Sequence, residues 1–471
     1  MTLISSPPNE PARTAPGPKG RRIVGVLPDV KRDPIHYLVK LAQQYGDVVC
    51  LPVGPTKVYM LTNPRLVGHV LHDNYKNYRK SDFYKKVQPV LGMGMITSDG
   101  ELWRSQRQLT QPAFRRERIN SLAEIMLDST NEMVARWRQP AARQTEVDIS
   151  AEMMRLSLRI IVRAIFDRDI GKDGDAIVES VTTVLAEAER RVWSLYDLPL
   201  AIPTPNNRRV SKALRTLDGI VLRLIRERRA EPGEAHGDLL SFFLEARDEN
   251  GQPMSDGELL DQVKTLIVAG HETSGSALAS TWTLLSRHPE VRQRLEAEVA
   301  DTAGKRAISF EDLPKLSYTK MVIQEAMRLY PPAWTISRAA IDDDIVGGYR
   351  IPAGATVMLS PFLIHRNVRY WENPEGFDPE RFDTTRASGI AEFSYMPFGG
   401  GPRKCIAEHF AMMEMVLAVA TLAQHYRLDL VPGRRIEPMP MISMRLGPNV
   451  PMVLHPRQTG QAQVAAPARA A

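Results

Sequence analysis

Residues 398–407 carry the strongest chemical signal in this sequence of 471 residues. Glycines 399–401 precede Arg403 and Cys405, and three consecutive glycines lose much conformational entropy on folding unless the backbone must approach something closely. Cys405 stands where a helix is predicted to begin, and main-chain N–H groups there can stabilise a thiolate. Such a thiolate can be an axial ligand of haem iron, and Arg403 can pair with a haem propionate. The alternative interpretation is a buried structural cysteine beside a glycine-rich turn.

The segment resembles the cytochrome P-450 signature F-x-x-G-x-R-x-C-x-G, which it matches at Phe398, Gly401, Arg403 and Cys405. The last position is Ala407 where the family usually has glycine, and alanine is small enough to keep the packing close. With the motifs below, the resemblance extends from about residue 50 to about residue 455. It implies a mainly α, single-domain fold with a small β region. In this triangular helical prism, haem b lies between a long central helix and the cysteine loop, Cys405 binds the iron and O₂ is the co-substrate.

A second motif, A-G-H-E-T-S at 269–274, lies in the middle of a long apolar helical segment. A mid-helix glycine costs about 1 kcal/mol relative to alanine, and a buried charge is costly, so an ordinary polar interruption is the weaker interpretation. The motif resembles the family's oxygen-activation sequence [AG]-G-x-[DE]-T. The resemblance implies that Gly270 lets the haem approach the helix and that Glu272 and Thr273 are the acid–alcohol pair that delivers protons. We expect His271 to be packed or hydrogen-bonded rather than a metal ligand.

A third motif, E-x-x-R, places Glu325 and Arg328 on one helix face, where they can form a hydrogen-bonded ion pair. Such spacing alone is common on protein surfaces. In the family this pair joins an arginine of a following P-E-R-F segment, here Arg381, to hold the cysteine loop. We therefore assign a structural role to the three residues.

Further residues are implied to surround the cofactor. Trp103 and Arg107 match the W-x-x-x-R of the family's haem-facing helix and, one turn apart, can both reach a propionate. Arg338 occupies another propionate-binding position of the family. Each of these taken singly could equally be a surface residue. The complete predicted cofactor set is Trp103, Arg107, Ala269, Gly270, Arg338, Phe398, Gly399, Arg403 and Cys405.

Position in the family also implies which segments line the substrate pocket, namely 83–96, 191–202, 266–273, 333–336 and 441–444. Their mostly apolar and aromatic residues predict a lipophilic small-molecule substrate such as a terpene, a fatty acid or a steroid. The individual residues predicted to line it are Phe83, Val90, Trp193, Leu266, Ala269, Ala333, Trp334, Thr335, Ile336 and Ile442.

The elements that must position these residues are mostly helical. Hydrophobic periodicity predicts helices at 33–45, 100–111, 117–137, 149–166, 175–195, 208–230, 256–287 and 406–424. A capping box at Ser255 and Glu258 starts the 256–287 helix, which is about 45 Å long. Strands are predicted at 48–53, 57–61, 335–339, 345–351, 356–359, 427–431 and 442–454, and the stretch 366–397 is predicted to be irregular.

Composition is ordinary for a globular protein, with 43% hydrophobic and 25% charged residues and a net charge of +6. No dense Lys/Arg run indicates nucleic-acid binding. Two cysteines, Cys50 and Cys405, form no disulfide framework, which favours a reducing cytoplasm. Residues 1–20 are predicted to be a disordered leader without a membrane anchor, 21–456 the catalytic domain and 457–471 a flexible tail. We expect a bacterial, cytoplasmic monomer.

The implied reaction inserts one atom of O₂ into a C–H or C=C bond and releases the other as water, using two electrons and two protons. The sequence shows no flavin or iron–sulfur segment, so we expect a separate ferredoxin or flavodoxin with its reductase. Docking is expected on the cysteine side, at Arg104, Arg115, Arg116 and Lys404. Two alternatives stay open. One is a peroxide-using or rearranging family member, against which the Glu272–Thr273 pair argues, and the other is a haem protein that binds gases or lipids without turnover.

Overall fold

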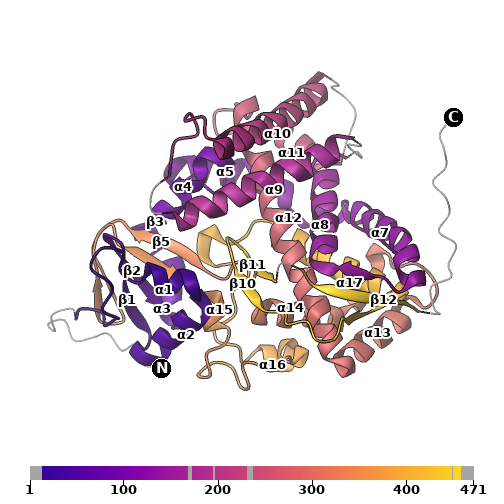
Figure 1. Cartoon of the computed structure of the whole chain (residues 1–471). Coiled ribbons are helices and arrows are strands. Elements are labelled where there is room, and N and C mark those ends of the chain that lie inside the picture. Colours follow the sequence, from indigo (N-terminus) through magenta and orange to yellow (C-terminus); the bar gives the residue numbers. More distant parts are fainter. Residues whose placement is uncertain (1–12, 168–171, 195–196, 231–236, 448, 458–471) are drawn as a thin grey trace.

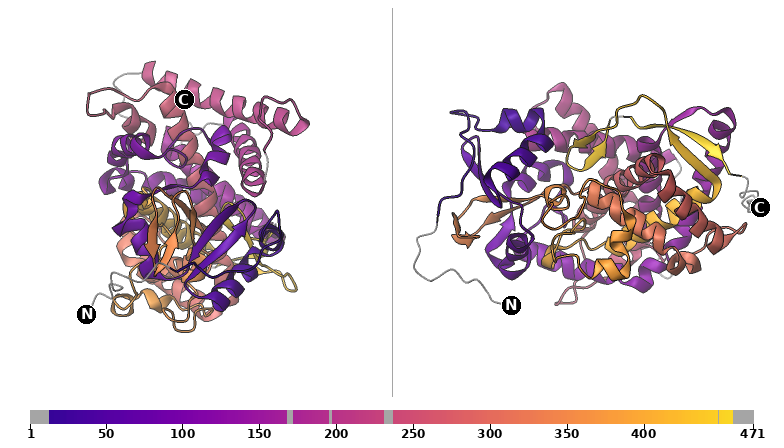
Figure 2. Two further views of the ribbon diagram at one scale, coloured as in Figure 1. Left: turned by 90° about the vertical axis from the view of Figure 1, so that its left-hand side faces the viewer. Right: turned by 90° about the horizontal axis from the view of Figure 1, so that it is seen from below.

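Helices dominate the structure, a computed structural model that describes residues 13–167, 172–194, 197–230, 237–447 and 449–457. Figure 1 shows the helices across most of the molecule and a β-rich part at its left, and Figure 2 shows that part from its own side. The longer helices are α2 (Pro34–Tyr45), α4 (Asp82–Leu91), α5 (Gly100–Thr110), α7 (Ala123–Arg143), α8 (Ile149–Phe166), α9 (Lys172–Trp193), α10 (Pro205–Ala230), α12 (Asp256–Arg287), α13 (Pro289–Ala303), α14 (Ser317–Leu329) and α17 (Glu408–His425). The shorter ones are α1 (Leu27–Arg32), α3 (Pro64–Gly68), α6 (Arg116–Asn120), α11 (Leu239–Glu245), α15 (Pro361–Ile364) and α16 (Thr384–Ala387).

The largest sheet joins three distant parts of the chain in the strand order β1-β2-β8-β5-β3. Strands β1 and β2 form the predicted antiparallel hairpin, β2 pairs in parallel with β8, and β5 lies antiparallel between β8 and β3. The β3–β5 register places Lys80 opposite Arg338. These strands are β1 (Val48–Val53), β2 (Thr56–Leu61), β3 (Tyr78–Lys80), β5 (Ile336–Ala340) and β8 (Thr356–Leu359). The smaller sheets contain β4 (Glu146–Asp148), β6 (Asp344–Val346), β7 (Tyr349–Ile351), β9 (Tyr426–Leu430), β10 (Pro438–Pro440), β11 (Met444–Leu446) and β12 (Pro451–Pro456).

The long helix α12 crosses the interior and begins with the predicted capping box. The Glu258 N–H donates to Ser255 Oγ at 3.3 Å, and the Ser255 N–H donates to the Glu258 carboxylate at 2.8 Å. Helix α12 packs most extensively on α8. Gly275 permits this contact, because a Cβ there would lie 2.8 Å from Met154 Sδ and 3.0 Å from Met154 Cα. None of the helices within the described ranges has the length and apolar composition that a membrane span requires.

Most predicted elements are present with shifts of a few residues, and three are divided. The predicted strand 345–351 is the hairpin of β6 and β7, because Gly347 and Gly348 have left-handed φ of 60° and 80° and turn the chain. The predicted helix 117–137 is two helices, α6 and α7, because Leu122 with ψ near 0° interrupts the helical backbone. The predicted strand 442–454 contains β11 and β12, since Gly447 has a left-handed φ of 56° and turns the chain between them.

Residues 13–20 belong to the folded protein, so the prediction of a disordered leader through residue 20 is wrong for this part. The Cys50 N–H donates to Pro16 O at 2.7 Å, and Ala15 is buried. Gly17 lies against β1, where a Cβ would come within 1.9 Å of Cys50 O. Arg457, the first residue of the predicted tail, is also held, because its N–H donates to His425 O at 2.9 Å. Residues 1–12 and 458–471 lie outside the described residues.

The contact between α8 and α12 gives a stability prediction. Gly275→Ala should destabilise the protein by about 1–3 kcal/mol, because its methyl group would overlap the backbone at Met154. The matched control is Gly219→Ala in α10, an exposed position where an added Cβ meets nothing within 4 Å. There alanine should stabilise the helix by up to about 1 kcal/mol. Thermal unfolding followed by circular dichroism compares the two variants, and equal midpoints would contradict this account.

Candidate active site

A cavity of about 340 Å³ lies between the middle of α12 and the loop that leads into α17. Every residue of the predicted cofactor set lines it, although these residues come from widely separated parts of the sequence: Trp103, Arg107, Ala269, Gly270, Arg338, Phe398, Gly399, Arg403 and Cys405. Thr273 and Lys80 line it as well. The fold therefore brings the predicted iron ligand and the predicted propionate partners to one place.

The glycines of the cysteine loop are required for two reasons. Gly399 and Gly401 have φ of 71° and 64°, in the left-handed region that glycine adopts readily. A Cβ at Gly401 would lie 1.8 Å from Leu71 O, and one at Gly400 would lie 2.7 Å from the Phe393 ring. The sequence analysis expected these glycines to permit close approach of a flat ligand, and Gly399 and Gly400 do line the cavity. Gly400 and Gly401 also permit close approach of other parts of the protein.

Cys405 is fixed in this loop by a main-chain hydrogen bond, which its N–H donates to Phe398 O at 2.9 Å. Burial raises the pKa of the Cys405 thiol, while the Ala407 N–H and the charges of Arg107 and Lys404 act in the opposite direction. The sequence predicted that the start of the helix would favour the thiolate, but the protein by itself favours the thiol. A coordinated metal ion would reverse this preference, because it deprotonates a coordinating thiol outright.

Basic side chains gather at this cavity. Arg338 is only 6% exposed, and Arg403 donates to Asp99 Oδ1 at 2.6 Å. Lys80, which the sequence analysis missed, is 8% exposed, and its Nζ donates to two main-chain carbonyls at 2.6 and 2.7 Å. Burial lowers the pKa of Lys80 to about 7, with Asp99 opposing this shift and Arg338 and Arg403 adding to it. The pairing of β3 with β5 brings Lys80 here, and a strand of three residues carries no periodicity that could predict it.

This donor set fits a haem. A cysteine is available for the iron. The summed positive charge of the basic side chains exceeds the single negative charge of Asp99, and this excess suits a ligand with two carboxylates; these side chains are Lys80, Arg107, Arg338 and Arg403. Trp103 lies under the Arg403 guanidinium, with 5.1 Å between the Arg403 Cζ and the ring centroid. The predicted role of these residues is therefore compatible with their charge and placement.

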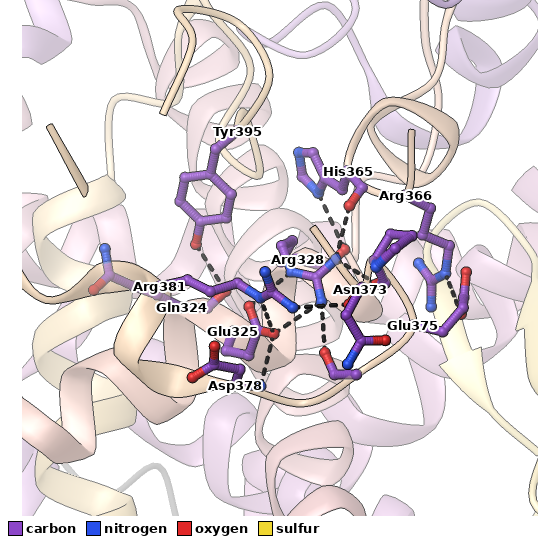
Figure 3. Close-up of polar contacts among 12 residues, drawn as sticks. Gln324, Glu325, Arg328, His365, Arg366, Asn373, Glu375, Asp378, Arg381 and Tyr395 are labelled. Carbon is purple, nitrogen blue, oxygen red and sulfur yellow. Dashed lines mark hydrogen bonds and ion pairs between the residues drawn. The ribbon is translucent and has the colours of Figure 1, made fainter. Parts of the chain in front are cut away.

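Glu325 and Arg328 form a fully buried ion pair at the end of α14 (Figure 3). The Arg328 Nε and Nη2 donate to the two carboxylate oxygens of Glu325 at 2.7 and 2.8 Å. Arg381 Nε donates to Glu325 Oε1 at 3.2 Å, so the predicted trio is brought together. The Asp378 N–H donates to the same oxygen at 3.0 Å. The remaining N–H groups of Arg328 donate to main-chain carbonyls of the irregular stretch, those of His365, Pro374 and Gly376.

His365 connects this ion pair to the cysteine loop and was not predicted. Its Nδ1 lies 3.2 Å from Arg328 O, and its Nε2 accepts the Met396 N–H at 2.9 Å. These two bonds require a neutral ring with the proton on Nδ1. Burial, and to a smaller extent the nearby Arg328 charge, lower the pKa of His365 to about 3. Met396 in turn accepts the Gly399 N–H at 3.0 Å. A lone histidine after the apolar run 361–364 gave no signal of this role.

The middle of α12 places Thr273 on the wall of this cavity, and Glu272 lines the second cavity described below. Thr273 Oγ1 donates to Ala269 O at 2.6 Å. Glu272 is 4% exposed and accepts two bonds at Oε1, from Arg445 Nε at 2.9 Å and Nη2 at 2.6 Å. The sequence predicted the acid but not its partner, because Arg445 lies 173 positions further along the chain. A Cβ at Gly270 would meet Ile161 Cγ1 at 3.1 Å, so this glycine also relieves a contact with α8.

A second cavity, of about 400 Å³, adjoins the first along α12, and we call it the distal cavity. The residues that line both cavities are Tyr84, Ile96, Ala269, Thr273, Pro332 and Ala333. The predicted pocket residues that line the distal cavity are Phe83, Trp193, Ala269, Ala333, Trp334, Thr335 and Ile442. Leu266 and Ile336 line the first cavity instead. Val90 lines neither cavity, because it is packed in the main hydrophobic core.

Apolar residues that the sequence analysis missed form much of the distal cavity. One group comes from the N-terminal part of the chain, which the β1–β2 hairpin carries to this wall: Leu27, Val30, Leu38, Leu51, Val53 and Val58. Leu185 and Met358 were missed as well, whereas five other lining residues lie within the segments that were predicted to line the pocket: Val87, Leu91, Val192, Val268 and Met441. The distal cavity is therefore a mostly apolar chamber of the size that suits a small organic ligand.

The His365 link predicts a specific defect. His365→Phe would leave the buried Met396 N–H without an acceptor, at a cost of about 1–3 kcal/mol, and would loosen the cysteine loop. We expect a lower haem content and a smaller thiolate-ligated fraction in the absorption spectrum of the reduced carbon monoxide complex. His365→Gln, which can accept the same N–H, should retain more of both. Equal spectra for the two variants would show that the link does not hold the loop.

Comparison with known proteins agrees with this geometry. The family model described as Cytochrome P-450 matches residues 15–455. The chain is 37% identical to "Cyclooctatin synthase" of Streptomyces melanosporofaciens over 97% of this chain and 99% of that protein, and 33% identical to "Pentalenene oxygenase" of Streptomyces avermitilis over 95% and 96%. A crystal structure of a cytochrome P-450 haem domain has the same fold, with a TM-score of 0.85 at 24% identity over 95% of this chain and 99% of that one. The chain belongs to the cytochrome P-450 family of haem monooxygenases.

Proposed function

We propose that this monooxygenase inserts one oxygen atom from O₂ into a terpene hydrocarbon or terpene alcohol. The observation that carries the proposal is the apolar distal cavity, which meets the cysteine-lined cavity at Ala269 and Thr273. Terpene, fatty acid and steroid were all expected from the sequence. The relatives favour the first class, since they include the cyclooctatin and pentalenene enzymes and a "Cyclooctat-9-en-7-ol 5-monooxygenase" that is 37% identical over 96% of this chain and 97% of that protein.

The residues have distinct proposed roles. Bound haem b supplies the activation of O₂, with Cys405 as the iron ligand. The sequence contains only two cysteines and no C-x-x-C-H, so covalent c-type attachment has no anchor. Arg107, Arg338 and Arg403 would hold the propionates, whereas Glu272 and Thr273 would hold and pass protons beside the substrate. Both cysteines are free, in keeping with the proposed cytoplasmic location.

Substrate class is tested by binding and by product. Sesquiterpenes, diterpenes, fatty acids and steroids are titrated into the ferric protein and scored by the shift of the haem from low to high spin. A terpene that binds is then incubated with electron donors under ¹⁸O₂, and we expect one labelled oxygen atom per product molecule. Binding of only fatty acids or steroids, or product without the label, would overturn the proposal.

Thr273→Ala tests the proton-delivery role and the two alternatives. Loss of the hydroxyl should leave substrate affinity nearly unchanged, reduce product formed per electron pair and increase hydrogen peroxide release, because the proton pathway is impaired. Thr273→Ser, which keeps the hydroxyl, is the control. A protein that binds haem without turnover would form no product in any variant. A peroxide-using enzyme would keep its peroxide-supported activity in Thr273→Ala.

Enzymes of this family need a redox partner, and we propose a ferredoxin or flavodoxin that docks on the cysteine side. Arg104 and Lys404 are exposed but pair with Glu101 and Glu408. Two other exposed cations, Arg115 and Arg116, have no ion-pair partner among the residues that the structure describes. Helix α6 lies beside the start of α17, where His409 Nε2 and Asn120 Oδ1 are 3.0 Å apart. An acidic partner would therefore meet unpaired positive charge close to the cysteine loop.

Charge reversal tests this docking surface. Arg115→Glu with Arg116→Glu should slow reduction by an acidic ferredoxin at least tenfold at low salt, with a smaller effect at high salt, because the attraction is screened. Arg208→Glu with Lys212→Glu on α10 makes the same change in net charge on exposed residues of another helix and should leave the rate unchanged. Stopped-flow measurement of the first electron transfer compares them. Similar rates for both double variants would place the docking surface elsewhere.

A further inference from the structure

The distal cavity is almost free of charge. Among the described residues that line it, Glu272 is the one with a charged side chain, and no lysine, arginine or histidine of the described chain lines it. The neighbouring cysteine-lined cavity has five basic residues, namely Lys80, Arg107, Arg338, Arg403 and Lys404, and none of them lines the distal cavity. A carboxylate in the distal cavity would therefore lose its hydration without gaining a counter-charge, which is costly.

The charge of Glu272 is itself compensated. Arg445 donates twice to Glu272 Oε1, from just behind the cavity wall, and its side chain is 30% exposed while that of Glu272 is 5% exposed. A second carboxylate lies near this pair, since burial and Glu272 raise the pKa of Glu189 and Arg445 lowers it. One carboxylate, that of Glu272, thus lies at the wall, and a second carboxylate, that of Glu189, and the Arg445 guanidinium interact with it from outside the lining. The wall repels an anionic ligand, and the pairing with Arg445 weakens its attraction for a cationic one.

We propose that the distal cavity selects uncharged lipophiles and rejects carboxylates, and that the Glu272–Arg445 pair determines this selectivity. This inference rests on the proposed function, in which the distal cavity binds the substrate. A neutral hydrocarbon, alcohol or ketone would enter without a charge penalty. A carboxylic acid would enter only in its protonated form, whose fraction falls tenfold per pH unit above a pKa of about 4.3.

The first test compares ligands with one carbon skeleton. An acyclic C20 terpene alcohol and the corresponding C20 acid, with a C15 pair as a replicate, are titrated into the intact holoenzyme between pH 5.5 and 8. Binding is followed by the spin-state shift and, independently, by equilibrium dialysis. We expect a dissociation constant for the alcohol that does not change with pH. That for the acid should rise about tenfold per pH unit and be at least about 100-fold larger than that for the alcohol at pH 7.5.

The second test alters the charges of Glu272 and Arg445 at the wall of the distal cavity. Glu272→Gln removes the negative charge and leaves Arg445 unpaired behind the cavity, so the acid should bind about tenfold more tightly than to wild type at pH 7.5, whereas the alcohol should change by less than about threefold. The double variant Glu272→Gln, Arg445→Met lacks both charges and should lose this gain. Unequal responses of acid and alcohol separate an electrostatic effect from a general disturbance of the pocket.

The outcomes are distinct. Equal binding of acid and alcohol at pH 7.5, or no gain in acid binding for Glu272→Gln, would overturn the selectivity inference. If acid and alcohol bind equally and the alcohol is oxygenated, the proposed terpene oxygenation stands without the inference. If neither member of either pair binds by either method, the proposed function fails and the inference fails with it. The comparison on wild-type protein requires no variant, so a variant that folds poorly leaves the proposal testable.

Discussion

The buried ion pair of Glu325 and Arg328 is the interaction on which the cysteine loop depends. Removing two charges from water costs several kcal/mol per ion, and the interaction is favourable only when the remaining donors and acceptors are also satisfied. Here Arg328 donates to three main-chain carbonyls as well as to Glu325, and Glu325 accepts from Arg381 and from the Asp378 N–H. The segment 365–381 supplies these partners. The pair therefore specifies the path of a segment that has little regular structure of its own.

A short series of hydrogen bonds connects this ion pair to the backbone of Cys405. His365 Nδ1 donates to the Arg328 carbonyl, and His365 Nε2 accepts the Met396 N–H. Phe398 lies two residues after Met396, and its carbonyl accepts the Cys405 N–H. Each bond is buried or lies in a turn that glycine permits. The position of Cys405 is consequently constrained from α14 and the core as well as from the start of α17, where Ala407 and Glu408 contact the loop. This explains how a thiol whose pKa is raised by burial can be presented at a defined place before any metal stabilises its charge.

The sequence predicted the elements and residues whose signal is local. Periodicity located the long helices, a capping box located the start of α12, and the motif residues lie together as the resemblance implied. It could not predict partners supplied by tertiary contact. Arg445 and Lys80 stand in strands of three residues, and His365 is an isolated histidine, so none has a pattern around it. Val90 was misplaced because its helix turns this residue into the core, and residues 13–20 look disordered by composition although β1 holds them.

Helix α12 separates two electrostatic environments, and Thr273 lies at their boundary. On one side, cations suit the propionates of a haem, and on the other lies the mostly apolar distal cavity, where the substrate is proposed to bind. The mostly apolar lining of this cavity has few groups that can carry a proton, and Glu272 is the one carboxyl group on its described wall. Both bonds from Arg445 go to Oε1, so Oε2 stays available to hold a proton. Arg445 can thus weaken, without removing, the effect of the Glu272 charge in the distal cavity, while Oε2 is left for the proposed proton transfer.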